Sequence, residues 1–481
     1  MTGNSRTRQD RKTAVPAMTG RRALASVVFA ACLAVCPWVQ GESAAGFDQY
    51  GGLAGLQFGP GKCFRTHHDG ERWWLVTPDG GAFLSLGVCN VNPVGDTDRV
   101  TGHQLYRENV LEIHGTVANW TAVTRNRLKE WGVNTLGAWS SGELRGAVPY
   151  TVELSLGAGL WGGGKVPDFF SPEAEAHLRS RAAAAAGYAD DPWLLGYYLD
   201  NELPWSYDWR FMPDLFPGYV AMPPEAPGKQ KLVAFLRERH GTVERLAAVW
   251  APAFANWEEM AEARFLAPRD RRAARGDMEA FMLLVARQYF KTTTGAVRAA
   301  DPNHLILGCR FVWALAPRPV VQACGEYCDV VSLNYYEVAG VGNALLLLSA
   351  GDAFRVPTEL DFRAFHEITK KPLMVTEFGF RGMDSGMPNT FPPGWLLQPT
   401  VPTQRDRADK FEHCAVTWMS QPYFLGYHWF EFVDEPKGGR FDGENGNYGV
   451  VNEKDEPYTE LVERFKAVNS RVWELHAASG R

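Results

Sequence analysis

The segment LLGYYLDNE, residues 194–202, is a short apolar run that ends in polar residues. Four to eight apolar residues bounded by polar ones are typical of a buried strand in a parallel sheet. The same arrangement returns in LMVTEFG, residues 373–379. We therefore predict two buried strands, and each presents a glutamate, Glu202 or Glu377, at its carboxyl end.

Similar apolar runs alternate with helical patterns along most of the chain, which favours parallel βα units. The predicted strands cover residues 83–88, 133–139, 150–154, 195–199, 305–311, 330–335, 373–376 and 424–430. Helical patterns include residues 172–188, 278–300, 404–419 and 459–473. Eight such repeats imply an α/β fold, a closed (β/α)8 TIM barrel whose active site lies at the carboxyl ends of its strands.

Two additions to this barrel are predicted. Residues 73–77 and the turn sequence PDGG at 78–81 form an N-terminal β-hairpin that leads into the first strand. Proline-rich and charged helical residues at about 205–275 form an insertion over the barrel mouth, where loops shape substrate choice. Because a barrel with insertions takes ~250 to over 400 residues, we expect residues 46–481 to form one catalytic domain.

Residues 1–45 are predicted to be a signal peptide. An apolar run at 23–35 follows two arginines, and it is too short to span a bilayer but suits the core of a signal peptide. The small residues at 43–45 offer a cleavage site. We expect an exported protein, periplasmic or extracellular. A lipoprotein is the less favoured alternative, because the residues before Cys32 and Cys36 each misfit a lipobox by one position.

Composition excludes several classes of protein. The 481 residues are 46% hydrophobic and 22% charged, which is typical of a globular protein with a large core. The formal net charge is -6 and the lysines and arginines are scattered, so we do not expect nucleic acid as a partner. Beyond the signal segment no run reaches ~18 apolar residues, so the mature protein should have no membrane span. The oligomeric state is not predicted.

Two glutamates after strands four and seven suit the hydrolysis of a glycosidic bond. In a TIM barrel both strands end at one mouth, from opposite sides. One carboxyl group must hold a proton and give it to the leaving oxygen, while the other stays ionised and attacks or shields the developing oxocarbenium ion. A carboxyl separation of ~5 to 5.5 Å would make the enzyme retaining.

The sequence resembles glycoside hydrolase clan A at these two strand ends. The matching residues are Asn201-Glu202 after strand four and TEFG at 376–379 after strand seven. The resemblance implies that Glu202 is the catalytic acid/base and that Glu377 is the nucleophile.

Within the clan, the chain is most similar to beta-agarases and related galactan hydrolases. The motifs that carry this likeness are WWLVTPDGGAF at 73–83, LGYYLDNELPW at 195–205, GYHWFEFVDEP at 426–436 and GRFDGENGNYG at 439–449. The likeness covers about residues 58–476. It implies a retaining β-glycoside hydrolase that acts by double displacement on a galactose-containing polysaccharide or its oligosaccharides.

Five further residues are predicted to bind the substrate or to support the glutamates. Asn201 could hydrogen-bond the sugar 2-hydroxyl, a contact that strengthens at the transition state. Tyr336 is expected to hold Glu377 in place, by resemblance to clan members with a tyrosine at the end of strand six. Trp429 offers an apolar face to the sugar ring, and His428 and Glu431 beside it could bond hydroxyl groups.

Other functions stay open at this stage. A beta-galactosidase, or another clan A hydrolase acting on a different glycan, is the nearest alternative. A catalytically inactive carbohydrate-binding protein belongs to a different class, and the presence of both glutamates argues against it. A metal-dependent barrel hydrolase is a third alternative. No cofactor or metal is expected, because His67-His68-Asp69 lies in a predicted turn with no matching ligand cluster.

Overall fold

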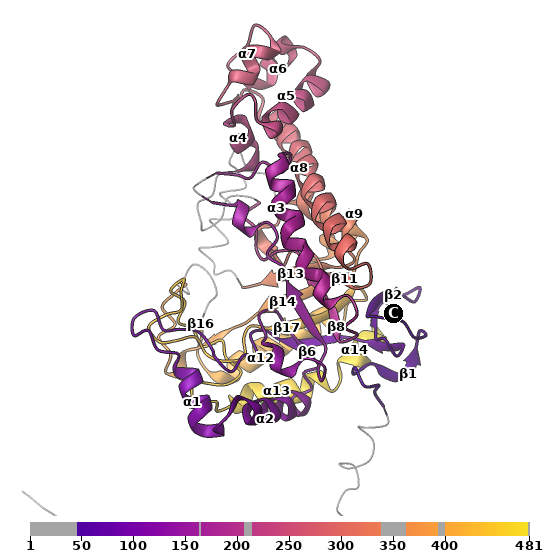
Figure 1. Ribbon diagram of the computed structural model, residues 1–481, viewed down its shortest axis with the longest axis vertical. Helices are drawn as coiled ribbons and strands as arrows, with labels where there is room; N and C mark the ends of the chain where they lie inside the picture. Colours follow the sequence, from indigo (N-terminus) through magenta and orange to yellow (C-terminus); the bar gives the residue numbers. More distant parts are fainter. Residues whose placement is uncertain (1–45, 163–164, 206–213, 338–361, 393–399, 480–481) are drawn as a thin grey trace, which may run out of the picture. The chain divides into compact units, whose positions relative to one another are not determined.

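A curled sheet of parallel strands forms the centre of the protein (Figure 1). The computed structural model describes residues 46–481 apart from 163–164, 206–213, 338–361, 393–399 and 480–481, so the predicted signal peptide lies outside the described residues. The strands are β5 (Ser85–Val88), β6 (Thr135–Leu136), β7 (Tyr150–Glu153), β8 (Leu194–Tyr198), β11 (Leu305–Ile306), β12 (Phe311–Val312), β13 (Val331–Tyr335), β14 (Leu373–Phe378) and β17 (Phe424–Trp429). Their order is β11-β8-β7-β6-β5-β17-β14-β13-β12.

The two outer strands of this order are halves of one strand position. β11 pairs with β8, whereas β12 pairs with β13, and residues 307–310 connect them. The pairing continues into this connection, since the Leu199 amide donates to the Gly308 carbonyl at 2.9 Å and the Leu307 amide to the Tyr197 carbonyl at 2.7 Å. The sheet therefore closes through eight positions, and the predicted TIM-barrel fold is confirmed.

Most strand boundaries differ from the prediction by one or two residues, and the largest differences are in strands two and five. Strand two is regular only over Thr135–Leu136, and strand five is interrupted. The interruption holds Arg310, with φ 47. A backbone in this left-handed region cannot continue a regular strand.

The predicted hairpin belongs to a larger antiparallel sheet. β3 (Trp73–Val76) and β4 (Gly81–Phe83) are flanked by β1 (Leu53–Gln57) and β2 (Arg65–His68), in the order β1-β4-β3-β2. The Trp73 amide donates to the Pro422 carbonyl just before β17, which places this sheet at the amino-terminal ends of the barrel strands. Leu75 and Phe83 pack there with barrel residues such as Leu195 and Met374.

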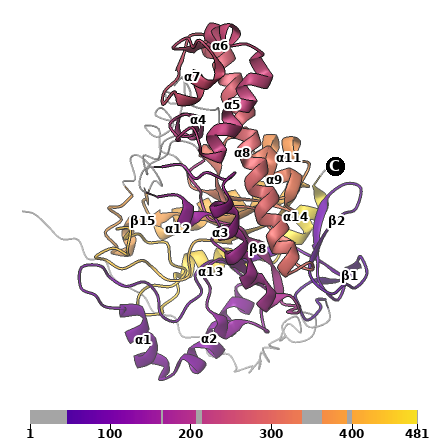
Figure 2. The same ribbon diagram turned by 45° about the horizontal axis from the view of Figure 1, so that its top comes forward.

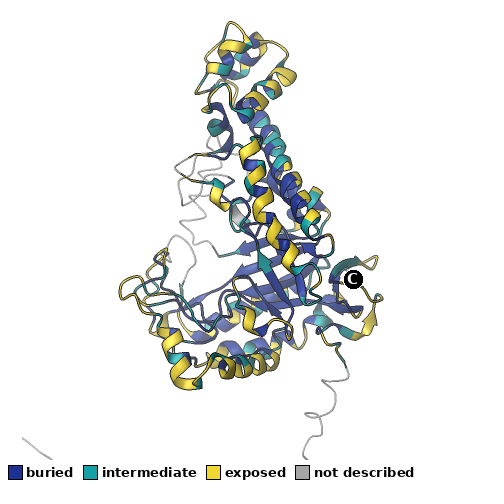
Figure 3. Cartoon of the chain, viewed as in Figure 1, coloured by how far each residue is buried: buried dark blue, intermediate teal, exposed yellow. Residues whose placement is uncertain are grey.

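Helices cover the outer face of the barrel, and their outward surfaces are exposed while the strands are buried (Figure 3). They are α1 (Leu105–His114), α2 (Val117–Glu130), α3 (Pro172–Ala182), α8 (Arg271–Ala300), α9 (Arg318–Tyr327), α11 (Phe362–Thr369), α12 (Gln404–Met419), α13 (Thr459–Asn469) and α14 (Val472–Ala478). Capping residues in the sequence determine where several of these helices begin. Thr403 and Asp406, for example, form a capping box at α12.

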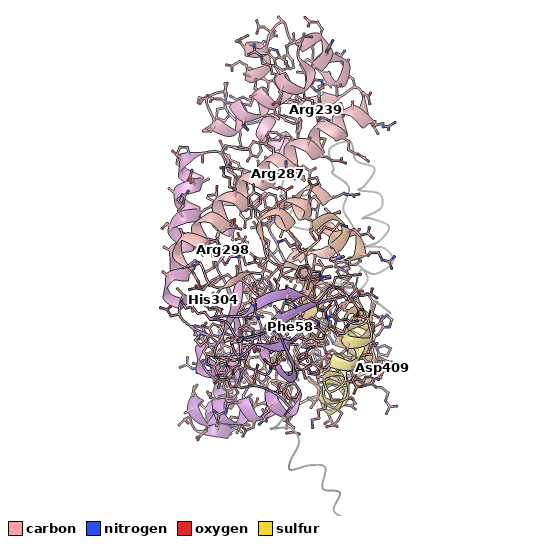
Figure 4. The ribbon with its side chains drawn as sticks, turned by 90° about the vertical axis from the view of Figure 1, so that its right-hand side faces the viewer. Phe58, Arg239, Arg287, Arg298, His304 and Asp409 are labelled. Atoms are coloured by element: carbon pink, nitrogen blue, oxygen red, sulfur yellow. The ribbon has the colours of Figure 1, made fainter. Side chains whose placement is uncertain are left out.

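The insertion between strands four and five is helical, and it leads into α8. Its elements are α4 (Leu215–Val220), α5 (Pro227–His240), α6 (Val243–Val249) and α7 (Trp257–Glu262), which lie together at one end of α8 (Figure 2). Arg287 and Arg298 follow one another along α8 toward its carboxyl end (Figure 4). Arg287 binds Glu326 of α9 at 2.7 Å, which ties the long helix to its neighbour.

Candidate active site

Strained backbone marks the carboxyl ends of consecutive barrel strands. Eight described residues other than glycine have a positive φ, and five of them follow strands one to four or interrupt strand five. These five are Asn90 (φ 54), Trp139 (φ 61), Ser155 (φ 50), Glu202 (φ 51) and Arg310 (φ 47). Because such conformations are uncommon and cluster at functional sites, the mouth of the barrel is the candidate active site.

Glu377 is the next-to-last residue of β14 and is 6% exposed. Its Oε2 accepts hydrogen bonds from Arg310 Nη2 at 2.7 Å and from Asn334 Nδ2 at 3.1 Å. Its Oε1 accepts one from the Tyr336 hydroxyl at 2.5 Å. Both carboxylate oxygens are therefore held by donors from neighbouring strands, and charged hydrogen bonds of this kind are the strong ones.

The donors around Glu377 keep their protons. Burial, and then the nearby Glu377, raise the pKa of the Tyr336 phenol well above its usual value. Burial acts to lower the pKa of the Arg310 guanidinium, but the charge of Glu377 outweighs it and the pKa is raised. A permanent cation and a phenol donor thus face the carboxyl group of Glu377.

Glu202 follows β8 and is partly exposed. Its Oε1 accepts from Asn334 Nδ2 at 2.9 Å, the same nitrogen that donates to Glu377 Oε2 at 3.1 Å. The two carboxylate oxygens are therefore no farther apart than the sum of these two distances. The structure brings the predicted pair of glutamates together around one amide group.

Asn201 joins the same network. Its Oδ1 accepts from Arg310 Nη1 at 2.8 Å and from Asn334 Nδ2 at 3.1 Å. Asn334 and Arg310 therefore connect the ends of strands four and seven, although neither was predicted. The signal was present, since each is a polar or charged residue inside a predicted buried strand, where such residues are rare unless they are paired.

Asp200, at the end of strand four, is bonded to three neighbouring residues. Its carboxylate accepts from the Gly157 amide at 2.8 Å, from the Ala158 amide at 3.0 Å and from the Tyr289 hydroxyl of α8. Burial raises the pKa of Asp200 to about 7. The residue next to Asn201 thus connects strand four to the loop after strand three and to a helix.

His428 and Glu431 lie deeper than predicted. Both are fully buried. His428 Nε2 bonds the Ser85 hydroxyl at 2.9 Å, and burial, followed by Arg310, lowers its pKa to about 3, so the ring is neutral. Glu431 accepts from Asn90 Nδ2 at 2.5 Å, and burial, followed by Asp96, raises its pKa well above the usual range. Neither side chain presents surface to the open mouth.

The structure does not place Trp429 at the site, which corrects the prediction. The side chain is fully buried, and its ring packs against Phe378, Phe411 and Phe465 in the layer between the barrel and the helices. Its indole N–H donates to the Tyr448 carbonyl at 2.8 Å. Successive residues of a strand point to opposite faces, so His428 points into the barrel and Trp429 points out of it.

Among the described residues, no group of three or more His, Cys, Asp and Glu side chains is arranged to hold a metal ion. No helix in the described ranges is long and apolar enough to cross a membrane.

Comparison with known sequences shows what the chain is related to. No protein-family model matches it. It is 28% identical over 475 residues to beta-agarase A of Vibrio sp. (strain JT0107), a match that covers 85% of this chain and 45% of the relative. It is 27% identical over 517 residues to beta-agarase B of the same strain, covering 89% and 50%. The chain therefore spans about half the length of these curated relatives.

Solved structures show the same fold. An exo-beta-agarase has a TM-score of 0.74 at 23% identity, with 90% of this chain and 68% of that chain covered. The agarase AgWH50C has a TM-score of 0.72 at 24% identity, with the same coverage of 90% and 68%. The chain is related to beta-agarases, and the resemblance drawn from its sequence motifs is confirmed.

Proposed function

We propose that the chain is a retaining β-glycoside hydrolase that acts, like an agarase, on a galactose-containing polysaccharide or its oligosaccharides. The observation that carries the proposal is the Asn334 amide nitrogen, which bonds Glu202 at 2.9 Å and Glu377 at 3.1 Å. Two carboxyl groups this close suit double displacement, whereas an inverting enzyme needs ~6.5 to 9.5 Å for a water molecule. The relationship to beta-agarases supports the substrate class.

In the first step Glu377 attacks the anomeric carbon and forms a glycosyl ester. Glu202 gives its proton to the glycosidic oxygen, which leaves with the electron pair of the broken bond. Arg310 and Tyr336 hold Glu377 in position for attack through bonds of 2.7 and 2.5 Å. In the second step water attacks the same carbon, Glu202 takes the proton of that water, and Glu377 leaves as carboxylate.

Asn201 is assigned to the sugar 2-hydroxyl. Its side-chain oxygen accepts from Arg310 and Asn334. These bonds fix the amide plane, so that the NH2 group of Asn201 is the part directed away from them and toward the sugar. A hydrogen bond to the 2-hydroxyl that strengthens at the transition state contributes several kcal/mol in such enzymes.

The location and the domain boundaries are part of the same proposal. Residues 1–45 act as a signal peptide, and residues 46–481 form the catalytic domain with its insertion at about 205–275. An enzyme that acts on a polysaccharide too large to enter the cell must be exported, to the periplasm or the medium.

The test is the release of reducing sugar by wild type and by Glu377→Gln from agarose, porphyran, carrageenan, arabinogalactan, β-glucan and aryl β-galactosides. We expect release from one of the galactans by wild type alone, with the β-anomer as first product by NMR. Release from aryl β-galactosides but from no polysaccharide would show a beta-galactosidase instead. A first product in the α-configuration would overturn double displacement. A folded wild type that binds galactan without cleaving it would be an inactive carbohydrate-binding protein.

A further inference from the structure

Arginines gather on the helical insertion and the start of α8, although the whole chain has a formal net charge of -6. Residues 264–277 hold five arginines against two aspartates. Arg269, Arg271 and Arg272 are exposed, and none of these three forms an ion pair within the described ranges. A local excess of positive charge in an acidic protein favours the binding of an anion.

Two arginines from neighbouring helices line one pocket in this region. Arg239 of α5 and Arg272 of α8 belong to its wall, and its volume is about 450 Å³. Gly276 of α8 also lines it, and a Cβ at this glycine would stand 3.3 Å from Arg239 Nη2, so the guanidinium lies against α8. Arg239 is in the insertion, while Arg287 and Arg298 follow further along α8 (Figure 4).

The two carboxyl groups of the pocket are already bonded within the protein. Asp277 is 1% exposed and accepts from Arg239 Nε at 2.5 Å and from His240 Nε2 at 2.9 Å. It also accepts from the Trp250 indole N–H at 2.8 Å. Asp270 is the N-cap of α8 and accepts from two backbone amides of its first turn. Neither carboxylate is therefore left to bind a cation, and Asp270 takes up the helix amides.

The donors that remain open in this pocket are guanidinium groups. Among the described residues, no atom accepts from the Nη nitrogens of Arg239 or from the guanidinium of Arg272. Guanidinium groups are weakly hydrated and bind the oxygens of an anion through paired hydrogen bonds. Two of them beside one pocket thus suit a group with several charged oxygens.

The pocket lies well away from the two glutamates. α8 runs from this pocket to Tyr289, whose hydroxyl bonds Asp200 at the end of strand four, next to Asn201 and Glu202. At a rise of 1.5 Å per residue, the part of α8 between Arg272 and Tyr289 spans ~25 Å. A long polymer can reach both places, whereas a small substrate at the catalytic centre cannot.

We propose that Arg239 and Arg272 bind a sulfate ester of a galactan chain that is cleaved at the distant glutamates. The inference rests on the proposed function and names sulfated galactans as its substrate class. A sulfate ester stays charged at every pH at which a protein is folded, and its three terminal oxygens can accept from both guanidinium groups. The site holds the polymer and takes no part in bond cleavage.

The test compares one polymer with and without its charge. Titration calorimetry on Glu377→Gln gives the Kd of porphyran, a sulfated galactan, before and after its sulfate esters are removed. The measurement is repeated with Arg239→Gln or Arg272→Gln added. Arg237→Gln is the matched control, because it removes the same charge from the same helix outside the pocket. The active enzyme with each substitution is assayed on an aryl β-galactoside.

We expect each pocket substitution to raise the Kd of sulfated porphyran about tenfold, because it removes charged hydrogen bonds. The Kd of the desulfated polymer and kcat/KM for the aryl galactoside should not change. Arg272→Gln breaks no hydrogen bond within the described protein, so its effect is separate from folding. An equal loss with Arg237→Gln would show a general charge effect and overturn the inference. An unchanged Kd in both pocket variants would overturn it too, leaving the proposed function intact.

Two further ligands identify the source of the anion. Wild type that binds inorganic sulfate, but binds sulfated and desulfated porphyran equally, would have a site for a free anion, which overturns the inference. Binding of a DNA oligonucleotide as tight as that of porphyran, and equally weakened by Arg272→Gln, would show a general polyanion site and also overturn it. Binding of sulfated porphyran that depends on Arg272, in a wild type that cleaves no galactan, would support the site and overturn the proposed hydrolysis.

Discussion

The two strand ends that carry the glutamates are built differently. Glu377 lies in regular β14, is 6% exposed, and has both carboxylate oxygens bonded by Arg310, Asn334 and Tyr336. Glu202 lies beyond the end of β8, with φ 51 and partial exposure, and bonds Asn334 at 2.9 Å. One carboxyl group is fixed inside the barrel, and the other stands in a strained turn at its rim.

This difference matches the roles that we propose for the two glutamates in double displacement. A nucleophile needs a fixed distance to the anomeric carbon and a charge that is present before attack, which Arg310 and Tyr336 favour at strand seven. An acid/base residue must exchange its proton with the leaving group and then with water, so partial exposure at strand four suits it. We therefore expect substitutions at the two strand ends to differ in their effect on turnover and in the product formed with azide.

The largest effect is expected at the strand-seven end. Glu377→Ala should lower kcat/KM by about 10⁴-fold or more, because no ester can form. Added azide should restore turnover and give an α-glycosyl azide, since it attacks from the vacated side. Product NMR checks the configuration, and Glu463→Ala on the surface of α13 is the control. Substantial activity of Glu377→Ala without azide would remove this residue as the nucleophile.

A smaller and more selective loss is expected at the strand-four end. Glu202→Ala should cost about 10² to 10⁴-fold on a polysaccharide, whose leaving group needs a proton, and far less on an activated aryl galactoside. Azide should here give a β-glycosyl azide, because it enters after the ester has formed. Equal losses on both kinds of substrate would contradict the acid/base role.

The support around Glu377 can be weakened by one atom. Tyr336→Phe removes the hydrogen bond to Oε1, and a bond to a charged group contributes about 1.5 to 3 kcal/mol, so kcat/KM should fall about tenfold to 100-fold. Tyr335→Phe is a matched control, because the neighbouring tyrosine packs outward against Trp313 and Trp418. Similar losses in both variants would indicate a general packing effect.

The smallest effect on turnover is expected from Asp200, which has a signature in stability instead. Its pKa is raised to about 7 in the folded protein, from an unfolded value near 3.9. The folded state therefore binds the extra proton, and the stability that this contributes is full below about pH 4 and is lost as pH rises to about 7. Asp200→Asn should remove this part of the pH dependence. Tm measured from pH 4 to 8 checks it, and parallel curves for the two proteins would contradict the assignment.

The positions of the barrel strands along the chain follow from local sequence patterns. Short buried strands need continuous apolar runs, and helices need a different spacing, so all eight strand positions could be predicted, and α12 at Gln404–Met419 matches its predicted range. Because parallel strands in a barrel all end at one mouth, the ranks of strands four and seven were enough to predict that Glu202 and Glu377 meet.

Tertiary structure decided which neighbours take part. The sequence does not reveal which residues of a strand face inward, because a strand buried on both sides is apolar throughout. For this reason Trp429 was placed at the site although it points outward, and His428 was placed at the mouth although it bonds Ser85 inside the barrel. Which residues meet at the barrel mouth likewise depends on contacts between strands that are far apart in the sequence. Arg310 and Asn334 come from strands five and six, and only closure of the barrel brings them to the two glutamates.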